Sequence, residues 1–72
     1  MTIVYTKKNC VQCDATKRYL DMHAIAYETV DIETDADALE KIVALGFRAA
    51  PVVESSIGSW SGYDPDKLSK LK

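Results

Sequence analysis

The sequence predicts an α/β domain whose elements follow one another in the order β-α-β-α-β-β-α. Short apolar runs rich in β-branched residues alternate with segments whose apolar residues recur at helical spacing. The composition, with 47% hydrophobic and 28% charged residues, is typical of a globular domain rather than of a disordered chain. No linker, repeat or low-complexity tract interrupts the 72 residues. We therefore expect one domain over residues 1–72, near the smallest size that a single hydrophobic core stabilises.

The first three elements are predicted to form a parallel β-α-β unit. Residues 2–6 (TIVYT) form a β-rich apolar run, and residues 27–32 (YETVDI) form another. Residues 11–23 between them predict a helix, because four residues recur there at helical spacing: Cys13, Thr16, Leu20 and His23. Two strands joined by such a crossover helix pair in parallel.

A second helix is predicted from the signals at its ends. Thr34, followed three residues later by Asp37, resembles a capping box at the start. Gly46 stands where a C-terminal glycine commonly ends a helix. The apolar stripe between these signals, which we expect to face the core, consists of Leu39, Ile42 and Val43.

A hairpin and a short helix complete the predicted fold. Pro51 opens the run PVVE, and a turn at Ser55–Ser56 leads to residues 57–60 (IGSW), a spacing that predicts two antiparallel strands. Asp64 is suited to cap the final helix, and Pro65 is suited to its first position. The inward edge of this helix is expected to consist of Leu68 and Leu71.

Charge and hydropathy exclude several classes of protein. The net charge of −2 argues against a strongly basic nucleic-acid binder, and no apolar run is long enough to cross a bilayer. The start of the sequence lacks the pattern of a signal peptide, so we expect a cytoplasmic protein. The charge is uneven, however: residues 1–18 sum to +3, residues 19–47 to −6, and residues 48–72 to +1. The positive segment surrounds both cysteines and favours a thiolate there.

The two cysteines of the chain, Cys10 and Cys13, are separated by only two residues. A disulfide that closes so short a loop removes little entropy from the unfolded chain, so a structural brace is the weakest interpretation. In the cytoplasm, a close cysteine pair is more often catalytic or metal-binding than structural. The pair is therefore the candidate functional site.

The predicted elements place this pair where a strand leads into a helix. Cys10 is expected at the helix N-terminus, where free backbone N–H groups and the helix dipole stabilise a thiolate, and Lys7 and Lys8 add positive charge. Cys10 is then the attacking nucleophile. Cys13, one turn further and more buried, resolves the mixed disulfide. Asp14 opposes the thiolate in part, although an acidic residue in the first turn also compensates the helix dipole.

The main alternative is that the pair forms half of a zinc site. Such a site needs four ligands in tetrahedral array, and the sequence offers no second cysteine pair. His23, the only histidine, lies ten residues beyond Cys13 on the same predicted helix, about 15 Å away by helical rise. A redox dithiol is favoured, because C-x-x-C beside a β-α-β pattern is itself a redox signal.

Four stretches together are far more specific than the cysteine pair alone: VYTK at residues 4–7, CVQC at 10–13, ALGFRAAPVV at 44–53 and WSGY at 60–63. In these stretches the chain resembles the thioredoxin superfamily and, within it, the NrdH-type redoxins. The resemblance implies a thioredoxin fold, with a mixed four-stranded sheet flanked by three helices. It also implies a monomeric dithiol electron carrier that accepts electrons from thioredoxin reductase and reduces class Ib ribonucleotide reductase. No bound cofactor is expected, and NADPH is used only through the reductase.

The same resemblance assigns residues to partner binding. It implies that Pro51 follows a cis peptide bond beside the dithiol, with the backbone of Ala50 free to pair with an extended substrate segment. The WSGY segment is expected to form a partially exposed docking loop that presents aromatic contact area, with a core position for Trp60, common for a lone tryptophan in a small domain, as the alternative. The complete set assigned to substrate or partner binding is Lys7, Val11, Gln12, Ala50, Pro51, Trp60, Ser61, Gly62 and Tyr63.

A glutathione-dependent glutaredoxin remains the alternative within the superfamily. Glutathione-using glutaredoxins have a pair of glycines and then two aspartates near the WSGY position, and only Gly62 and Asp64 match here. The residues between the cysteines, VQ, differ from the proline-tyrosine pair common in glutaredoxins, whereas Lys7 is shared with them. Reduction by thioredoxin reductase or by glutathione distinguishes the two.

Overall fold

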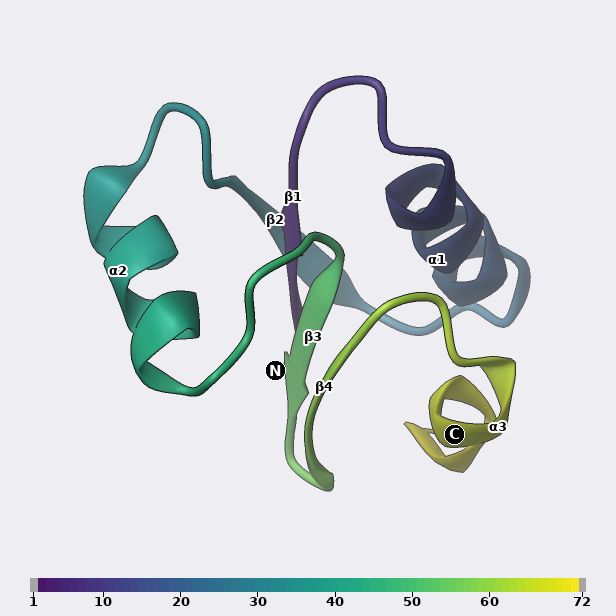
Figure 1. Ribbon diagram of the computed structural model, residues 1–72. Coiled ribbons are helices and arrows are strands. Elements are labelled where there is room, and N and C mark those ends of the chain that lie inside the picture. The colour runs from purple at the N-terminus through teal and green to yellow at the C-terminus, as the bar shows by residue number, and fades with distance from the viewer. Residues whose placement is uncertain (1, 72) are drawn as a thin grey trace.

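The computed structural model describes residues 2–71 and has a four-stranded mixed sheet at its centre (Figure 1). The strand order is β2-β1-β3-β4, with β1 parallel to β2 and antiparallel to β3, and with β3 antiparallel to β4. The strands are β1 (Thr2–Thr6), β2 (Tyr27–Asp31), β3 (Val52–Ser55) and β4 (Gly58–Ser61). The predicted parallel unit and antiparallel hairpin are thus confirmed.

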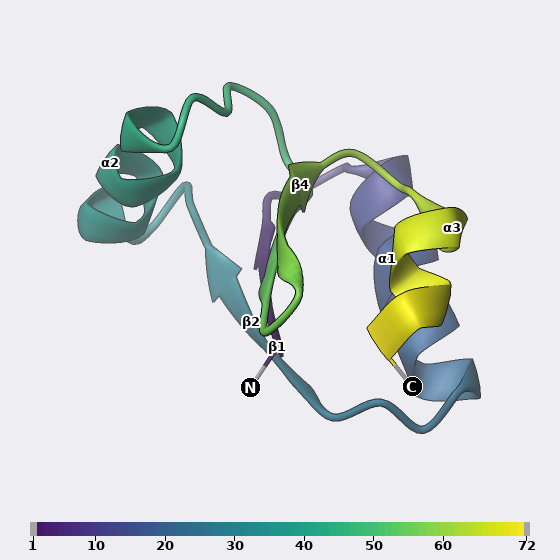
Figure 2. The same ribbon diagram turned by 90° about the horizontal axis from the view of Figure 1, so that it is seen from below.

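Helices cover both faces of this sheet. The helices are α1 (Val11–Met22), α2 (Ala36–Ala44) and α3 (Pro65–Leu68), and a 3-10 turn (Ser69–Leu71) extends α3. Figures 1 and 2 show α1 and α3 together on one side of the sheet and α2 on the other. The predicted order of elements is confirmed, although α1 ends one residue early and His23 serves as its C-cap.

Each face of the sheet has its own apolar core, because successive side chains of a strand point to opposite faces. Val4 and Val53 point to the α1/α3 side, whereas Tyr5 and Val52 point to the α2 side. The first core consists of Val4, Leu20, Val53, Trp60 and Leu68, and the second of Tyr5, Ala38, Ile42 and Val52. The core on the α1/α3 side therefore lies directly beneath the helix that carries the cysteines.

The α2 stripe differs from the prediction. Only Ile42 of the three expected residues is buried, with an exposed fraction of 1%, whereas Leu39 and Val43 are 43% and 55% exposed. Ala38, one helical turn before Ile42, is the second residue that faces the sheet. The 3.6-residue helical period places positions four apart on one face, so Leu39 and Val43 are displaced together to the side.

The start of α2 was also predicted wrongly, and its end correctly. The N-cap is Asp35, whose carboxylate accepts a hydrogen bond from the Ala38 N–H at 3.0 Å. The hydroxyl of Thr34 instead donates to the Asp31 carbonyl. Gly46 follows the helix in the left-handed region, at φ +93°, as a C-terminal glycine does.

A polar network connects α2 to the sheet. The Tyr5 hydroxyl and the Lys41 ammonium both donate to Glu54 Oε1, at 2.9 and 3.1 Å. These hydrogen bonds lower the pKa of Glu54 below its ordinary value of 4.5. Burial, followed by the hydrogen bond to Glu54, raises the pKa of Tyr5. The network stabilises α2 against the sheet while the Glu54 carboxylate is ionised.

The β3–β4 hairpin and α3 flank the short segment, residues 62–64, that faces α1. The hairpin turn lies at Ser56–Ile57, one residue later than predicted, because Ser55 still pairs with Gly58. Asp64 caps α3 by accepting from the Lys67 N–H at 3.1 Å, and Pro65 occupies its first turn, as predicted. The predicted inward residues are also found: Leu68 is fully buried, and the partly buried Leu71 packs against the same core.

Candidate active site at the start of helix α1

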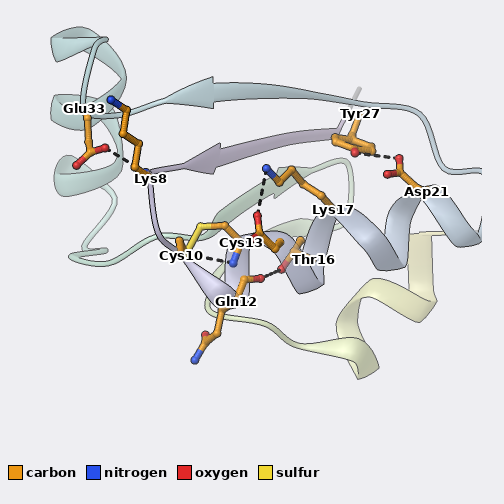
Figure 3. Close-up of polar contacts among 10 residues, drawn as sticks. Lys8, Cys10, Gln12, Cys13, Thr16, Lys17, Asp21, Tyr27 and Glu33 are labelled. Carbon is orange, nitrogen blue, oxygen red and sulfur yellow. Dashed lines mark hydrogen bonds and ion pairs between the residues drawn. A yellow bond between two sulfur atoms is a disulfide. The ribbon is translucent and has the colours of Figure 1, made fainter.

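Cys10 and Cys13 form a disulfide at the N-terminal end of α1, with their Cα atoms 5.2 Å apart (Figure 3). Asn9, at φ +55°, adopts the left-handed conformation that asparagine tolerates well, and Cys10 follows with an extended backbone. These two residues turn the chain from the loop after β1 into α1. Cys10 is thus the N-cap residue of the helix, and Cys13 lies within its first turn.

The helix N-terminus stabilises negative charge on the sulfur of Cys10. Cys10 Sγ accepts a hydrogen bond from the backbone N–H of Cys13 at 3.1 Å, in the position of a capping oxygen. When the disulfide is reduced, this donor and the helix dipole favour the Cys10 thiolate. Cys10 is also the more accessible cysteine, with an exposed fraction of 8% against 1% for Cys13. Both observations agree with attack by Cys10 and resolution by Cys13.

The charged residues near the pair have a mixed arrangement. Lys7 and Lys8 are exposed on the loop that precedes Cys10, and the Lys8 backbone N–H donates to Glu33 Oε1 at 3.1 Å (Figure 3). Asp14, in the first turn of α1, forms an ion pair with Lys17 at 3.6 Å. The positive charge of Lys17 therefore offsets the carboxylate that would oppose a thiolate at Cys10.

The segment before β3 has the geometry that the resemblance implied. The Ala50–Pro51 peptide bond is cis, which confirms that expectation, and Pro51 is buried. The Pro51 carbonyl accepts a hydrogen bond from the Gly62 N–H at 2.8 Å. The Ser61 hydroxyl donates to the Ala49 carbonyl at 3.0 Å. These two hydrogen bonds join the segment before β3 to the loop that leads into α3.

Gln12 connects this loop to the cysteine turn, a contact that the sequence analysis did not anticipate. Gln12 Oε1 accepts a hydrogen bond from the Tyr63 backbone N–H at 3.1 Å. A Cβ atom at Gly62 would lie 3.4 Å from the same oxygen, and Gly62 has a positive φ of +87°. The positive φ therefore disfavours a residue with a side chain at position 62, whereas a Cβ there would only contact the end of the flexible Gln12 side chain. Gln12 is exposed, yet it positions the loop as well as bordering it.

Trp60 does not lie in an exposed docking loop, and this part of the prediction is wrong. It belongs to β4, is only 5% exposed, and packs in the α1/α3 core against Val53 and Leu68. The ladder pairs Trp60 with Val53, whose side chain points to the same face of the sheet. Strand alternation therefore directs the indole into the core, while Ser61 beside it is exposed.

The other residues assigned to partner binding surround the cysteine turn or border it. Val11, immediately after Cys10, is 83% exposed, and Tyr63 is 40% exposed. They are apolar groups that a partner can cover without rearrangement of the fold. Hydrogen bonds join Gln12 to Tyr63 and Gly62 to Pro51, so those four residues form one continuous rim. Lys7 and Ser61 are exposed, and Ala50 is half-buried.

The described residues contain no cluster of ligands that would support the alternative metal site. Within residues 2–71, no three histidine, cysteine, aspartate or glutamate side chains gather as metal ligands would. His23 lies at the opposite end of α1, where its ring packs on Tyr19 with the ring centroids 4.2 Å apart. No helix in the described part of the chain has the length and apolarity needed to span a membrane.

Comparison with known proteins assigns the chain to a family. The glutaredoxin family model matches residues 2–56. The glutaredoxin-like protein NrdH of Lactococcus lactis subsp. lactis is 41% identical over 71 residues, which cover 99% of each chain. The NrdH protein of Escherichia coli K12 is 40% identical over 68 residues, which cover 94% of this chain and 84% of its own. The chain belongs to the glutaredoxin family, in its NrdH group.

Solved structures agree with this assignment to the NrdH group. The NrdH-redoxin from Escherichia coli superposes with a TM-score of 0.95 and 38% identity, over 99% of this chain and 93% of its own. A thioredoxin-like protein designated BC3987 superposes with a TM-score of 0.91 and 27% identity, over the whole of both chains. The predicted thioredoxin fold is therefore confirmed. With its cysteine pair in place, this NrdH-like chain is a thiol-disulfide oxidoreductase.

Proposed function

We propose that the chain is a cytoplasmic dithiol electron carrier that accepts electrons from thioredoxin reductase and reduces the disulfide of class Ib ribonucleotide reductase. The observation that carries the proposal is the place of Cys10 as the N-cap of α1, where its sulfur accepts the Cys13 N–H. This arrangement supplies an accessible thiolate and a buried resolving thiol within one helical turn. The family assignment extends the thiol chemistry to the NrdH type of carrier.

The reducing half-reaction transfers two electrons to a protein disulfide. The Cys10 thiolate attacks one sulfur of the substrate disulfide, so a mixed disulfide forms and the other substrate sulfur leaves as a thiolate that takes up a proton. Cys13 then loses its proton and attacks the Cys10 sulfur. The mixed disulfide breaks, and the substrate leaves as a dithiol. The Cys10–Cys13 disulfide that remains is the state seen in this structure.

The recharging half-reaction runs in the opposite direction with a different partner. A thiolate of the reductase attacks the Cys10–Cys13 disulfide, and a second reductase thiol releases the chain as a dithiol. NADPH supplies the two electrons through the reductase, so the carrier itself needs no bound cofactor. The thioredoxin-like activity profile described for the Escherichia coli NrdH-redoxin, which is 38% identical to this chain, supports this choice of electron donor.

The chain is proposed to act as a monomer, and the rim around the disulfide is proposed to bind both partners. Val11 and Tyr63 provide the exposed apolar contacts, and Lys7 provides positive charge on the loop that precedes Cys10. The backbone of Ala50, before the cis peptide bond, is offered to an extended segment of the substrate. Nucleic acid and membranes take no part in this function.

A reduction assay with two electron sources tests the proposal. The oxidised chain is incubated with NADPH and thioredoxin reductase, or with NADPH, glutathione and glutathione reductase, and NADPH oxidation is followed by absorbance. We expect efficient reduction only with thioredoxin reductase, and the reduced chain should then sustain turnover of a class Ib ribonucleotide reductase. Faster reduction by glutathione would instead identify a glutathione-dependent glutaredoxin. The Cys10→Ser variant is the control for turnover that does not pass through the dithiol.

A further inference from the structure

A second concave surface lies along β4, outside the cysteine site. It is a groove of about 250 Å³ between β4 and the segment formed by α3 and its 3-10 turn. Its lining residues are Ile57, Gly58, Ser59, Trp60, Lys67 and Lys70. Figure 1 shows the β3–β4 turn at the opposite end of the sheet from the loop that leads to α1, and Figure 2 shows α3 beside β4. The groove therefore starts far from the disulfide and follows β4 toward it.

The outer edge of β4 is free to pair with another strand. β4 is the last strand in the sheet order and pairs only with β3 among residues 2–71. The hydrogen bond from the Gly62 N–H to the Pro51 carbonyl marks the pair whose polar groups face each other. Such pairs recur every second residue in an antiparallel ladder, so the N–H and C=O groups of Trp60 also face β3. Those of Ser59 and Ser61 must point to the free edge.

The groove beside this edge is positively charged. Lys67 and Lys70 are both exposed, and neither forms an ion pair within residues 2–71. The Lys67 ammonium lies 5.9 Å from the ring centroid of Trp60. Trp60 Nε1 is buried and has no hydrogen-bond partner among the described residues. Because Nε1 is itself closed to solvent, only the rest of the Trp60 side chain borders the groove, and the two ammonium groups are the charges that a ligand there can reach.

We propose that this groove binds an acidic extended segment of a partner protein, which adds to β4 as a fifth strand. The outward N–H and C=O groups of Ser59 and Ser61 supply the main-chain hydrogen bonds of such an addition. In the added strand, the residue opposite Trp60 projects to the same face as the indole. An aspartate or glutamate at that position meets Lys67 and Lys70.

Charge complementarity favours an acidic segment as the occupant of the groove. The lining contains two lysines and no carboxylate, so a basic segment is repelled and a neutral one leaves both ammonium groups without a partner. This strand addition uses the edge of β4, whereas the addition at Ala50 uses the segment before β3. The inference does not depend on electron transfer, so it stands or falls separately from the proposed function.

Nuclear magnetic resonance of the full chain in its oxidised form tests the proposal with a designed peptide. The probe is the cysteine-free peptide acetyl-Thr-Glu-Thr-Glu-Thr-Glu-Thr-amide, and its controls replace every glutamate by glutamine or by lysine. Trp60 is the only tryptophan, so its indole N–H gives a single resonance that reports on a residue bordering the groove. We expect saturable shifts of this resonance and of the Ser59 amide with the glutamate peptide. Binding of the glutamine peptide should be about fivefold weaker or more, as two partly exposed ion pairs imply.

Two sets of variants distinguish the contribution of the groove lysines from that of the free edge of β4. Lys67→Gln/Lys70→Gln should weaken the glutamate peptide about fivefold or more, whereas Lys17→Gln/Arg18→Gln, which removes the same charge from α1, should not. Ser59→Pro removes an N–H that points away from β3 and should abolish binding, with Ser59→Ala as its control. Because proline could disturb the strand, a peptide N-methylated on alternate residues tests the same hydrogen bonds on the native chain.

Several outcomes would overturn the proposal. Equal affinity for the glutamate and glutamine peptides, or equal loss in the α1 control variant, would show that the two groove lysines do not select the ligand. Undiminished binding of every N-methylated peptide would exclude strand addition. Inorganic phosphate that reproduces all the shifts would reduce the groove to a site for small anions. The absence of any shift of the indole or the Ser59 amide with the glutamate peptide would remove the site altogether.

Discussion

The cysteine turn and the WSGY segment (residues 60–63) touch each other through Gln12 and Tyr63, yet only the cysteine turn was predicted correctly from the sequence. The cysteine turn is built from residues within one helical turn, and its Cys13-to-Cys10 hydrogen bond spans three residues. The conformation around Trp60 depends on Val53 in the neighbouring strand and on Leu68 in α3. Local spacing therefore indicated the chemistry, whereas exposure at the second region depended on contacts from separate elements.

The largest effect is expected from substitution of the two cysteines, whose turn is built from contacts between residues close in sequence. Cys13→Ser should accumulate a stable mixed disulfide with a protein substrate, because Cys10 can still attack but nothing resolves the product. Cys10→Ser should abolish turnover without trapping a substrate. Non-reducing mass spectrometry after incubation with a disulfide substrate distinguishes them. Faster iodoacetamide labelling of Cys13 than of Cys10 in the reduced wild-type chain would reverse the two roles.

Substitution of Trp60 tests the region whose burial depends on tertiary contacts, because Trp60 is a core residue. Trp60→Ala should cost about 3–5 kcal/mol in the free energy of unfolding, as truncation of a buried aromatic does. Tyr63→Ala, at an exposed residue three positions further along the chain, should change the free energy of unfolding by about 0.5 kcal/mol or less. Urea unfolding followed by circular dichroism measures both.

The same two variants also distinguish stability from docking. At a temperature where each variant is fully folded, Trp60→Ala should reduce kcat/KM with thioredoxin reductase and the rate with a small aromatic disulfide by similar factors. Tyr63→Ala should reduce only the rate with the reductase, by about tenfold if it is an interface hot spot. A selective loss with the reductase in Trp60→Ala, without a loss of stability, would restore the docking role predicted for this residue.

Gln12 connects the two regions and should have an intermediate effect. Gln12→Ala removes the acceptor of the Tyr63 N–H and should lower the free energy of unfolding by about 1 kcal/mol. Gln12→Glu keeps an acceptor oxygen and should retain most of that stability, while its added charge raises the pKa of Cys10 in the reduced chain. The pH dependence of iodoacetamide labelling measures the second effect. An unchanged stability in Gln12→Ala would show that this hydrogen bond does not hold the loop.

The smallest effect is expected on the opposite face, at Glu54. Its pKa is lower in the folded chain than in the unfolded one, so its stabilising contribution is present above about pH 4.5 and is lost as the pH falls through the folded pKa. The free energy of unfolding of wild type should exceed that of Glu54→Gln by about 0.5–1 kcal/mol near pH 6, and the difference should shrink as the pH falls below 4.5. Urea titrations of both proteins from pH 3.5 to 7 give the comparison. A difference that is constant over this range would exclude ionisation of Glu54 as its source.

Much of the fold was accessible from short-range patterns. The alternation of β-branched runs with helical spacing predicted all seven elements in order, and Asp64, Pro65 and Gly46 marked helix ends correctly. Errors arose where two neighbouring residues could serve the same role. Thr34 and Asp35 can both cap a helix, and the geometry of the preceding turn, in which the Thr34 hydroxyl bonds to Asp31, selected Asp35.

The candidate site divides in the same way. The sequence by itself determined that Cys10 and Cys13 share the first turn of a helix, because three residues span about one turn whatever surrounds them. Only the tertiary structure decided that Trp60 is buried, that Leu39 and Val43 are not, and that Gln12 reaches Tyr63. The physical reason is that burial depends on strand register and on which elements cover a face. Gln12 and Tyr63 are 51 residues apart, and no local spacing encodes such a contact.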